Sequence, residues 1–153
     1  MIREKIAEAL KQGMRAKNEA ATMTLRMINA AIKQKDIDVA RPRGDERISD
    51  EEILSLLQGL IKSRREAIDL YKKGGRQDLV DKEQGEIGII EQFLPRQLSE
   101  EEAKAAVKDV VAALGAGSIK DMGKVMAALK AKYAGRLDMT KAAAIVKQVL
   151  ANQ

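Results

Sequence analysis

The sequence predicts an all-α protein made of two small helical domains. It has 153 residues, 45% hydrophobic and 33% charged, which is enough apolar material to bury a core. Only 2 residues are proline and 2% are aromatic, so local preference favours helix along nearly the whole chain. Apolar residues recur at helical spacing and no strand-like alternation competes with them. We expect an N-terminal domain of about four helices, residues 1–97, and a three-helix C-terminal domain, residues 98–153.

The first two helices are expected over about residues 2–17 and 19–39, because leucine and isoleucine there fall on one face. Asn18 directly precedes the second helix, where its side chain suits an N-cap. The segment ARPRGDERI, residues 40–48, then interrupts the pattern with Pro42 and Gly44. This segment is typical of an exposed turn, and it shows no recognisable cradle for a ligand.

The third helix has a well-defined predicted start and end. Ser49 and Glu52 have the spacing of a capping box, in which each side chain bonds the other residue's backbone N–H. The paired glycines at residues 74–75 permit the left-handed backbone that ends a helix. A fourth helix follows over about residues 77–93. Two glycines inside it cost roughly 1 kcal/mol each relative to alanine, so we expect it to be the softest long element.

The boundary between the domains is predicted in FLPRQLSEEE, residues 93–102. Pro95 biases the residue before it away from helix, and Ser99 with Glu102 forms a second potential capping box. The helix that starts there should end at the glycines near residue 115. Ser118 and Asp121 are predicted to cap the next helix, and the last begins near residue 139.

The residue types that the chain lacks exclude much chemistry. It has 0 Cys and 0 His, so disulfides, thiol nucleophiles, cysteine zinc sites and imidazole acid–base catalysis are absent. No P-loop, dinucleotide fingerprint or metal-ligand spacing occurs. Acidic clusters such as EEE at residues 100–102 fall in helix first turns, where their negative charge interacts favourably with the positive end of the helix dipole. We therefore expect no catalytic residue, no cofactor and no metal.

The location is expected to be the cytosol. No window approaches the roughly 18 apolar residues that a membrane span requires, so no membrane association is expected. The N-terminal stretch MIREKIAEAL alternates charged and apolar residues and lacks the apolar run of a secretory signal.

The positive charge is concentrated near the C-terminus. The formal net charge is +5, and from Ser118 onward there are seven basic residues against two acidic ones, so the preceding residues sum to zero. On a helix starting near residue 120, the apolar residues share one side while lysines and small residues share the other. Such a face suits a phosphate backbone, whose counterions the lysines would release. It also suits a plain solvated helix face, which the residues alone favour over a nucleic-acid contact.

A second basic cluster lies in IKSRREAIDLYKKGGR, residues 61–76, where acidic residues dilute the charge. Arg65 has the spacing to pair with Asp69, which favours a solvated helix face there. The three aromatic residues of the chain are scattered along apolar stripes, so stacking on RNA bases is not expected.

Three segments resemble the GatB/YqeY family: TLRMINAAIK (residues 24–33), AIDLYKKGGRQDLVDKEQGEIGIIEQFLPRQLSEEE (67–102) and IKDMGKVMAALKAKYAGRLD (119–138). The resemblance spans nearly the whole chain, and the middle segment is its most specific part. It implies an N-terminal helical domain followed by a small domain similar to the C-terminal tail of GatB, a subunit of the glutamine-dependent aminoacyl-tRNA amidotransferase. That tail contacts tRNA.

The resemblance implies a non-catalytic module that binds tRNA or associates with amidotransferase or aminoacyl-tRNA synthetase components. The family is linked to carbon–nitrogen ligase activity with glutamine as amido-N-donor, yet no catalytic residue is visible in this chain. A helical protein–protein interaction module without RNA binding is the alternative. The RNA-binding residues that we predict are Lys120, Gly123, Lys124, Lys130, Lys132, Arg136 and Lys141.

Overall fold

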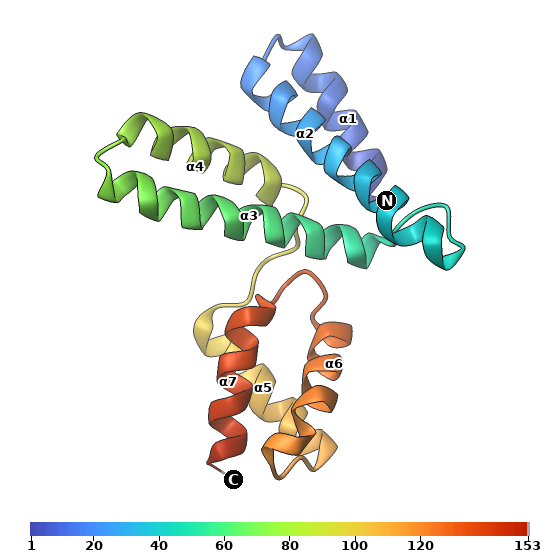
Figure 1. Ribbon diagram of the computed structural model, residues 1–153, viewed down its shortest axis with the longest axis vertical. Helices are drawn as coiled ribbons and strands as arrows, with labels where there is room; N and C mark the ends of the chain where they lie inside the picture. The colour runs from blue at the N-terminus through green and yellow to red at the C-terminus, as the bar shows by residue number, and fades with distance from the viewer. Residues whose placement is uncertain (153) are drawn as a thin grey trace. The chain divides into compact units, whose positions relative to one another are not determined.

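The computed structural model describes residues 1–152 and separates the chain into two units, Met1–Leu94 and Pro95–Gln153. Within the described residues both units are built from helices alone (Figure 1). The predicted all-α fold class is therefore confirmed. We describe each unit by itself.

The N-terminal unit consists of two helical hairpins, α1–α2 and α3–α4 (Figure 1). In the first hairpin, the side chain of Asn18 accepts a hydrogen bond from the N–H of Ala21 at 3.1 Å, so the predicted cap is confirmed. In the second, Gly75 adopts a φ of 70° directly after α3, as the paired glycines predict. The helices are α1 Ile2–Arg15, α2 Glu19–Lys35, α3 Asp50–Lys73 and α4 Gln77–Glu91.

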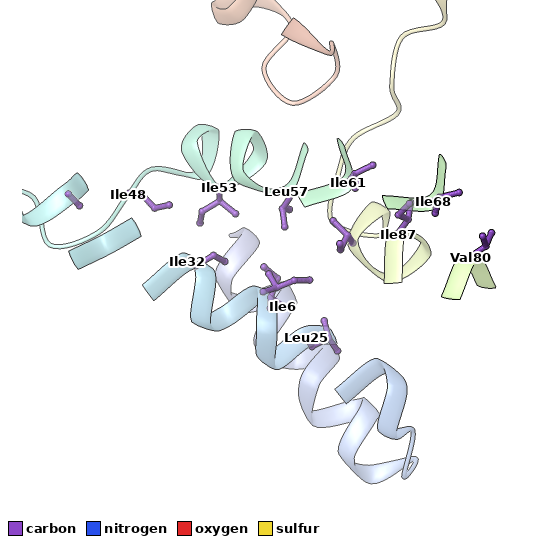
Figure 2. Close-up of a cluster of buried hydrophobic side chains, with 13 residues drawn as sticks. Ile6, Leu25, Ile32, Ile48, Ile53, Leu57, Ile61, Ile68, Val80 and Ile87 are labelled. Carbon is purple, nitrogen blue, oxygen red and sulfur yellow. The ribbon is translucent and has the colours of Figure 1, made fainter. Parts of the chain in front are cut away.

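Aliphatic side chains hold the two hairpins together. Ile6 from α1 and Ile32 from α2 point toward Ile53 and Leu57 on α3 (Figure 2). All four side chains are almost completely removed from water. Burial of each such side chain stabilises the fold by about 1.5–3 kcal/mol, so these contacts set how the hairpins pack.

The end of α2 differs from the sequence prediction. Instead of continuing as α-helix to residue 39, the chain forms a π turn, Asp36–Ala40, and a 3₁₀ turn, Arg41–Arg43. Asp36 is buried there and accepts two hydrogen bonds from the guanidinium of Arg3, at 2.6 and 3.0 Å. It also accepts one from the N–H of Ile48 at 2.8 Å. These long-range bonds, which local spacing does not reveal, fold the loop back onto α2.

The start of α3 is fixed by a capping box to which an arginine is added. The Ser49 hydroxyl accepts from the N–H of Glu52 at 3.2 Å, and the Glu52 carboxylate accepts from the N–H of Ser49 at 2.9 Å. Arg43 then donates two hydrogen bonds to the same carboxylate, at 2.6 and 2.8 Å. The Arg43 bonds, followed by the Ser49 backbone bond, lower the pKa of Glu52 to about 2.

The C-terminal unit is a three-helix bundle with its own aliphatic core (Figure 1). Its first helix uses the same arrangement, since Ser99 and Glu102 form a capping box and Arg96 donates two hydrogen bonds to Glu102, at 2.8 and 3.0 Å. The Arg96 bonds come first among the causes that lower the pKa of Glu102 to about 2. The helices are α5 Glu100–Leu114, α6 Met122–Lys132 and α7 Met139–Ala151.

Two local sequence predictions are wrong. Ser118 makes no side-chain capping bond, because the Asp121 carboxylate instead accepts from the N–H of Gly117 at 3.1 Å and closes the loop before α6. Arg65 pairs with Glu91 on α4 at 3.4 Å, although the sequence spacing pointed to Asp69 on its own helix. In the second case the packing of α4 beside α3 supplies a carboxylate that the sequence of α3 alone does not reveal.

The two capping glutamates predict acid sensitivity. A glutamate has a pKa of about 4.3 in an unfolded chain, and both Glu52 and Glu102 have a folded pKa of about 2. A depressed folded pKa contributes stability above pH 4.3, and this contribution is lost as the pH falls toward about 2. Urea unfolding of wild type should therefore show a lower free energy of unfolding at pH 3 than at pH 7.

The matched variant is Glu52→Gln with Glu102→Gln, which keeps both capping boxes but removes the charge that faces each arginine. It should be less stable than wild type at pH 7 and show a smaller drop in stability between pH 7 and pH 3. The same drop in variant and wild type would contradict the assignment of the acid sensitivity to these two groups.

Candidate nucleic-acid interface

Helix α6 separates apolar from basic residues along its length. Val125 and Leu129 are fully buried in the core of the C-terminal unit. At 100° per residue, the exposed residues of α6 on the opposite side lie within an arc of about 120°. We call them the α6 outer face: Gly123, Lys124, Ala127, Lys130 and Ala131.

The α6 outer face has little side-chain bulk between its lysines. A Cβ added at Gly123 would meet no atom within 4 Å, and Ala127 and Ala131 are exposed. Lys120 lies in the 3₁₀ turn Ile119–Asp121, directly before α6, and is also exposed. A broad polyanion can therefore approach the helix backbone between the ammonium groups.

The structure does not bring all seven predicted residues onto this face. Lys132 lies about 160° around the helix from Lys130, and its ammonium group is 5.6 Å from the centroid of the Tyr133 ring. Such a cation–π contact directs the charge toward the ring. Lys141 is exposed but belongs to the first turn of α7.

Arg136 has a structural contact that the sequence does not indicate. Its Nε donates to the carbonyl of Arg96 at 3.1 Å, and its own carbonyl accepts from the N–H of Leu98 at 2.8 Å. The Gln97 side chain adds a hydrogen bond to the carbonyl of Gly135. Arg136 thus ties the turn between α6 and α7 to the segment that precedes α5.

The acidic residues near α6 and α7 accept hydrogen bonds from backbone N–H groups. The Asp121 carboxylate accepts from Gly117, and the Asp138 carboxylate caps α7 by accepting from the N–H groups of Thr140 and Lys141, at 2.9 and 3.2 Å. From Ser118 to Asn152, none of the seven basic side chains forms an ion pair with a described residue. Apart from Lys132, which faces the Tyr133 ring, and Arg136, which bonds the Arg96 carbonyl, these side chains remain available to an external anion.

The N-terminal unit differs, because many of its arginines have carboxylate partners. Arg64 is the most enclosed: its side chain is 15% exposed and lies 2.9 Å from Glu86 and 3.8 Å from Glu83 on α4. The other paired arginines of this unit are Arg3, Arg43, Arg65 and Arg76. In the basic cluster at residues 61–76, Arg64, Arg65 and Arg76 are therefore paired with carboxylates.

Sequence reasoning missed a second group of basic residues, at the corner between α2 and α3. Lys33, Arg41 and Arg47 line a common pocket there. They are far enough apart in the sequence that no single helix face contains them. The only signal was the charge of the loop itself, which is equally typical of an exposed turn.

As far as Asn152, no three acidic side chains gather in the way that a metal site needs. Within the same residues, no helix is both long enough and apolar enough to cross a membrane.

The fold and the α6 outer face define a two-unit, all-helical protein with a basic helix in its C-terminal unit. A family model described as "Yqey-like protein" matches residues 3–150, nearly the whole chain. The protein therefore belongs to the YqeY-like family, which confirms the family predicted from the three sequence segments.

Curated relatives support the same membership. "Altered inheritance of mitochondria protein 41, mitochondrial" of Pyrenophora tritici-repentis is 32% identical over 129 residues, which cover 80% of this chain and 68% of that protein. The protein of the same name in Eremothecium gossypii is 36% identical over 89 residues, 58% of this chain and 46% of the relative. A Schizosaccharomyces pombe protein described as uncharacterized is 30% identical over 99 residues, 65% of this chain and 73% of its own length. The chain thus spans about half to three quarters of the length of these relatives.

The names of these relatives contradict the cytosolic location that we expected. The matching proteins of P. tritici-repentis and E. gossypii are both described as mitochondrial. The expectation was wrong because it rested on the lack of a signal or membrane span, and neither feature determines the compartment of a protein. None of these names mentions tRNA, an amidotransferase or a ligase.

The contact of Arg136 predicts that it acts differently from the lysines of the α6 outer face. Arg136→Ala removes the hydrogen bond to the Arg96 carbonyl and should lower the free energy of unfolding by about 1 kcal/mol. Lys124→Ala removes an exposed side chain without an ion pair and should stay within about 0.5 kcal/mol of wild type. Urea unfolding followed by circular dichroism measures both. Equal effects of the two substitutions would show that the Arg136 contact does not stabilise the unit.

Proposed function

We propose that this protein is a non-catalytic RNA-binding module of the YqeY-like family whose C-terminal unit holds tRNA through the α6 outer face and Lys120. The observation that carries the proposal is the charge balance after Ser118. Seven basic side chains there lack ion pairs among the described residues, and the two carboxylates, Asp121 and Asp138, are occupied by backbone N–H groups. An unpaired cationic surface of this kind gains free energy by releasing the counterions of a polyanion.

The arrangement favours contacts to phosphate and sugar. Gly123, Ala127 and Ala131 leave room for a nucleic-acid backbone between Lys124 and Lys130. No aromatic side chain belongs to the α6 outer face, so bases have nothing to stack on there. The module would therefore recognise the shape and charge of RNA and not its sequence.

The choice of tRNA among RNAs comes from the resemblance to the GatB tail. In that view, this protein would act beside amidotransferase or aminoacyl-tRNA synthetase components. The carbon–nitrogen ligase chemistry linked to the family would then belong to such an enzyme, while this chain contributes RNA contacts.

A protein-interaction role is the second candidate, and exposed apolar side chains in the same unit favour it. Leu114 at the end of α5 is 49% exposed and Ile119 just before α6 is 55% exposed. Contiguous exposed apolar patches mark protein contact sites, and this role requires Leu114 and Ile119 to belong to one such patch. This role predicts a partner that binds without nucleic acid.

Charge reversal on the α6 outer face tests the proposal. The variant Lys120→Glu, Lys124→Glu, Lys130→Glu should bind labelled tRNA at least 30-fold more weakly than wild type in fluorescence anisotropy at 0.1 M salt. Each lost phosphate interaction makes the plot of log K against log salt less steep by about 0.7–0.9, so losing three should make the slope shallower by about 2.1–2.7. The helical circular dichroism spectrum should not change, because all three lysines are exposed.

The matched control reverses three exposed lysines of the N-terminal unit, Lys5, Lys11 and Lys82, and should leave tRNA affinity within about threefold of wild type. Equal weakening in both variants would mean that net charge alone drives binding. Unchanged binding in the C-terminal variant would refute the assigned surface, and the exposed Leu114 and Ile119 would then become the site to test.

A further inference from the structure

The corner between α2 and α3 contains an open pocket of about 680 Å³. Lys33 from α2, Arg41 from the 3₁₀ turn and Arg47 from the loop line it, together with Ile37 and Glu46. We propose that this pocket binds a small organic phosphate of about the size of a nucleoside monophosphate. The site lies entirely in the N-terminal unit and shares no residue with the α6 outer face.

The walls of the pocket are held in place before any ligand arrives. Arg3 and the N–H of Ile48 both bond the carboxylate of Asp36, so the loop is anchored to the end of α2. Arg43 anchors the other side of the loop, since its Nε donates to Asp45 at 2.7 Å and its terminal nitrogens donate to Glu52. A preformed site loses less conformational entropy when it binds a ligand.

The charge inside the pocket is positive after the internal pairs are counted. Of the two aspartates that line it, Asp36 pairs with Arg3, whereas Asp45 shares Arg43 with Glu52 and is neutralised only in part. Lys33, Arg41 and Arg47 make no ion pair with residues 1–152, and Glu46 is the remaining lining carboxylate.

The end of α2 adds roughly half a negative charge to the pocket. Three cations therefore face about two negative charges, from Glu46, half of Asp45 and the helix end, and the remaining charge of about +1 attracts a phosphate.

The residue types in the pocket define the ligand class. Guanidinium groups form paired hydrogen bonds with phosphate oxygens, and Arg41 and Arg47 both line the pocket. Ile37 is 47% exposed and gives the pocket an apolar surface for the organic part of a ligand. Because the pocket is open to solvent, a bound ligand would keep part of its surface exposed. The π turn Asp36–Ala40 adds a local irregularity of the kind that is frequent at functional sites.

The test is an NMR titration of the ¹⁵N-labelled full-length protein with AMP, adenosine and sodium phosphate at constant ionic strength. AMP should shift the amide signals of Ile37, Gly44 and Arg47 saturably, inorganic phosphate should shift the same signals more weakly, and adenosine should leave them unchanged. Shifts by adenosine as large as those by AMP would overturn the proposal. The absence of any shift at about 10 mM AMP would also overturn it, because a site that is still empty at this concentration binds more weakly than usual small-molecule sites.

Two variants distinguish binding in this pocket from non-specific attraction of AMP to the protein's positive charge. Arg41→Gln with Arg47→Gln should raise the apparent dissociation constant for AMP at least tenfold while the remaining spectrum stays folded, because both side chains are exposed. The matched control, Lys11→Gln with Arg15→Gln, removes two exposed cations of α1 and should bind AMP like wild type. Equal AMP affinity in the two variants would also overturn the proposal. The α6 outer face is intact in both variants, so either result leaves the RNA proposal to its own test.

Discussion

The arrangement on which both units depend is the bonded group of serine, glutamate and arginine at the start of α3 and of α5. In each, a serine hydroxyl and a glutamate carboxylate satisfy two helix N–H groups, and an arginine donates two hydrogen bonds to that carboxylate. Asn18 and Asp138 cap α2 and α7 with one side chain each, so the group of three residues is the more extensive form of cap in this chain. These polar groups set the helix starts, and the aliphatic stripes then decide which faces pack together.

This use of carboxylates also determines where free positive charge remains. In the N-terminal unit, pairs such as Arg3–Asp36 and Arg64–Glu86 join different helices, so the charge of these arginines is neutralised within the fold. After Ser118 the two aspartates close loops and cap helices, and the lysines have no comparable partner among the described residues. The chain therefore has little net charge in its first unit and a basic surface in its second. The first unit also contains cations without an ion pair, and three of them line the corner pocket.

Local interactions were predictable from the sequence and long-range ones were not. The caps at Asn18, Ser49 and Ser99 follow from residue type and spacing within four positions, and all three are present. The π turn was missed because it depends on Arg3, which lies 33 residues away from Asp36. The Ser118 side chain does not cap the helix, because the Asp121 carboxylate accepts from the N–H of Gly117 instead. Sequence spacing does not tell which of the two side chains will bond the backbone.

The candidate site shows the same division. Helical periodicity placed Lys120 and Lys124 on the exposed side correctly, since helical geometry alone determines this. It did not reveal that Arg136 bonds the Arg96 carbonyl, because that contact joins residues 40 positions apart. The corner pocket was missed for a similar reason, as its lining residues meet only when the loop folds back onto α2.

The most direct test of the central claim is to measure how fast each lysine reacts with an amine-specific reagent, with and without tRNA, by mass spectrometry. Contact through the α6 outer face predicts slower modification of Lys120, Lys124 and Lys130 in the presence of tRNA, while Lys82 on α4 reacts at the same rate. Equal protection of every lysine, or protection confined to the N-terminal unit, would contradict the account.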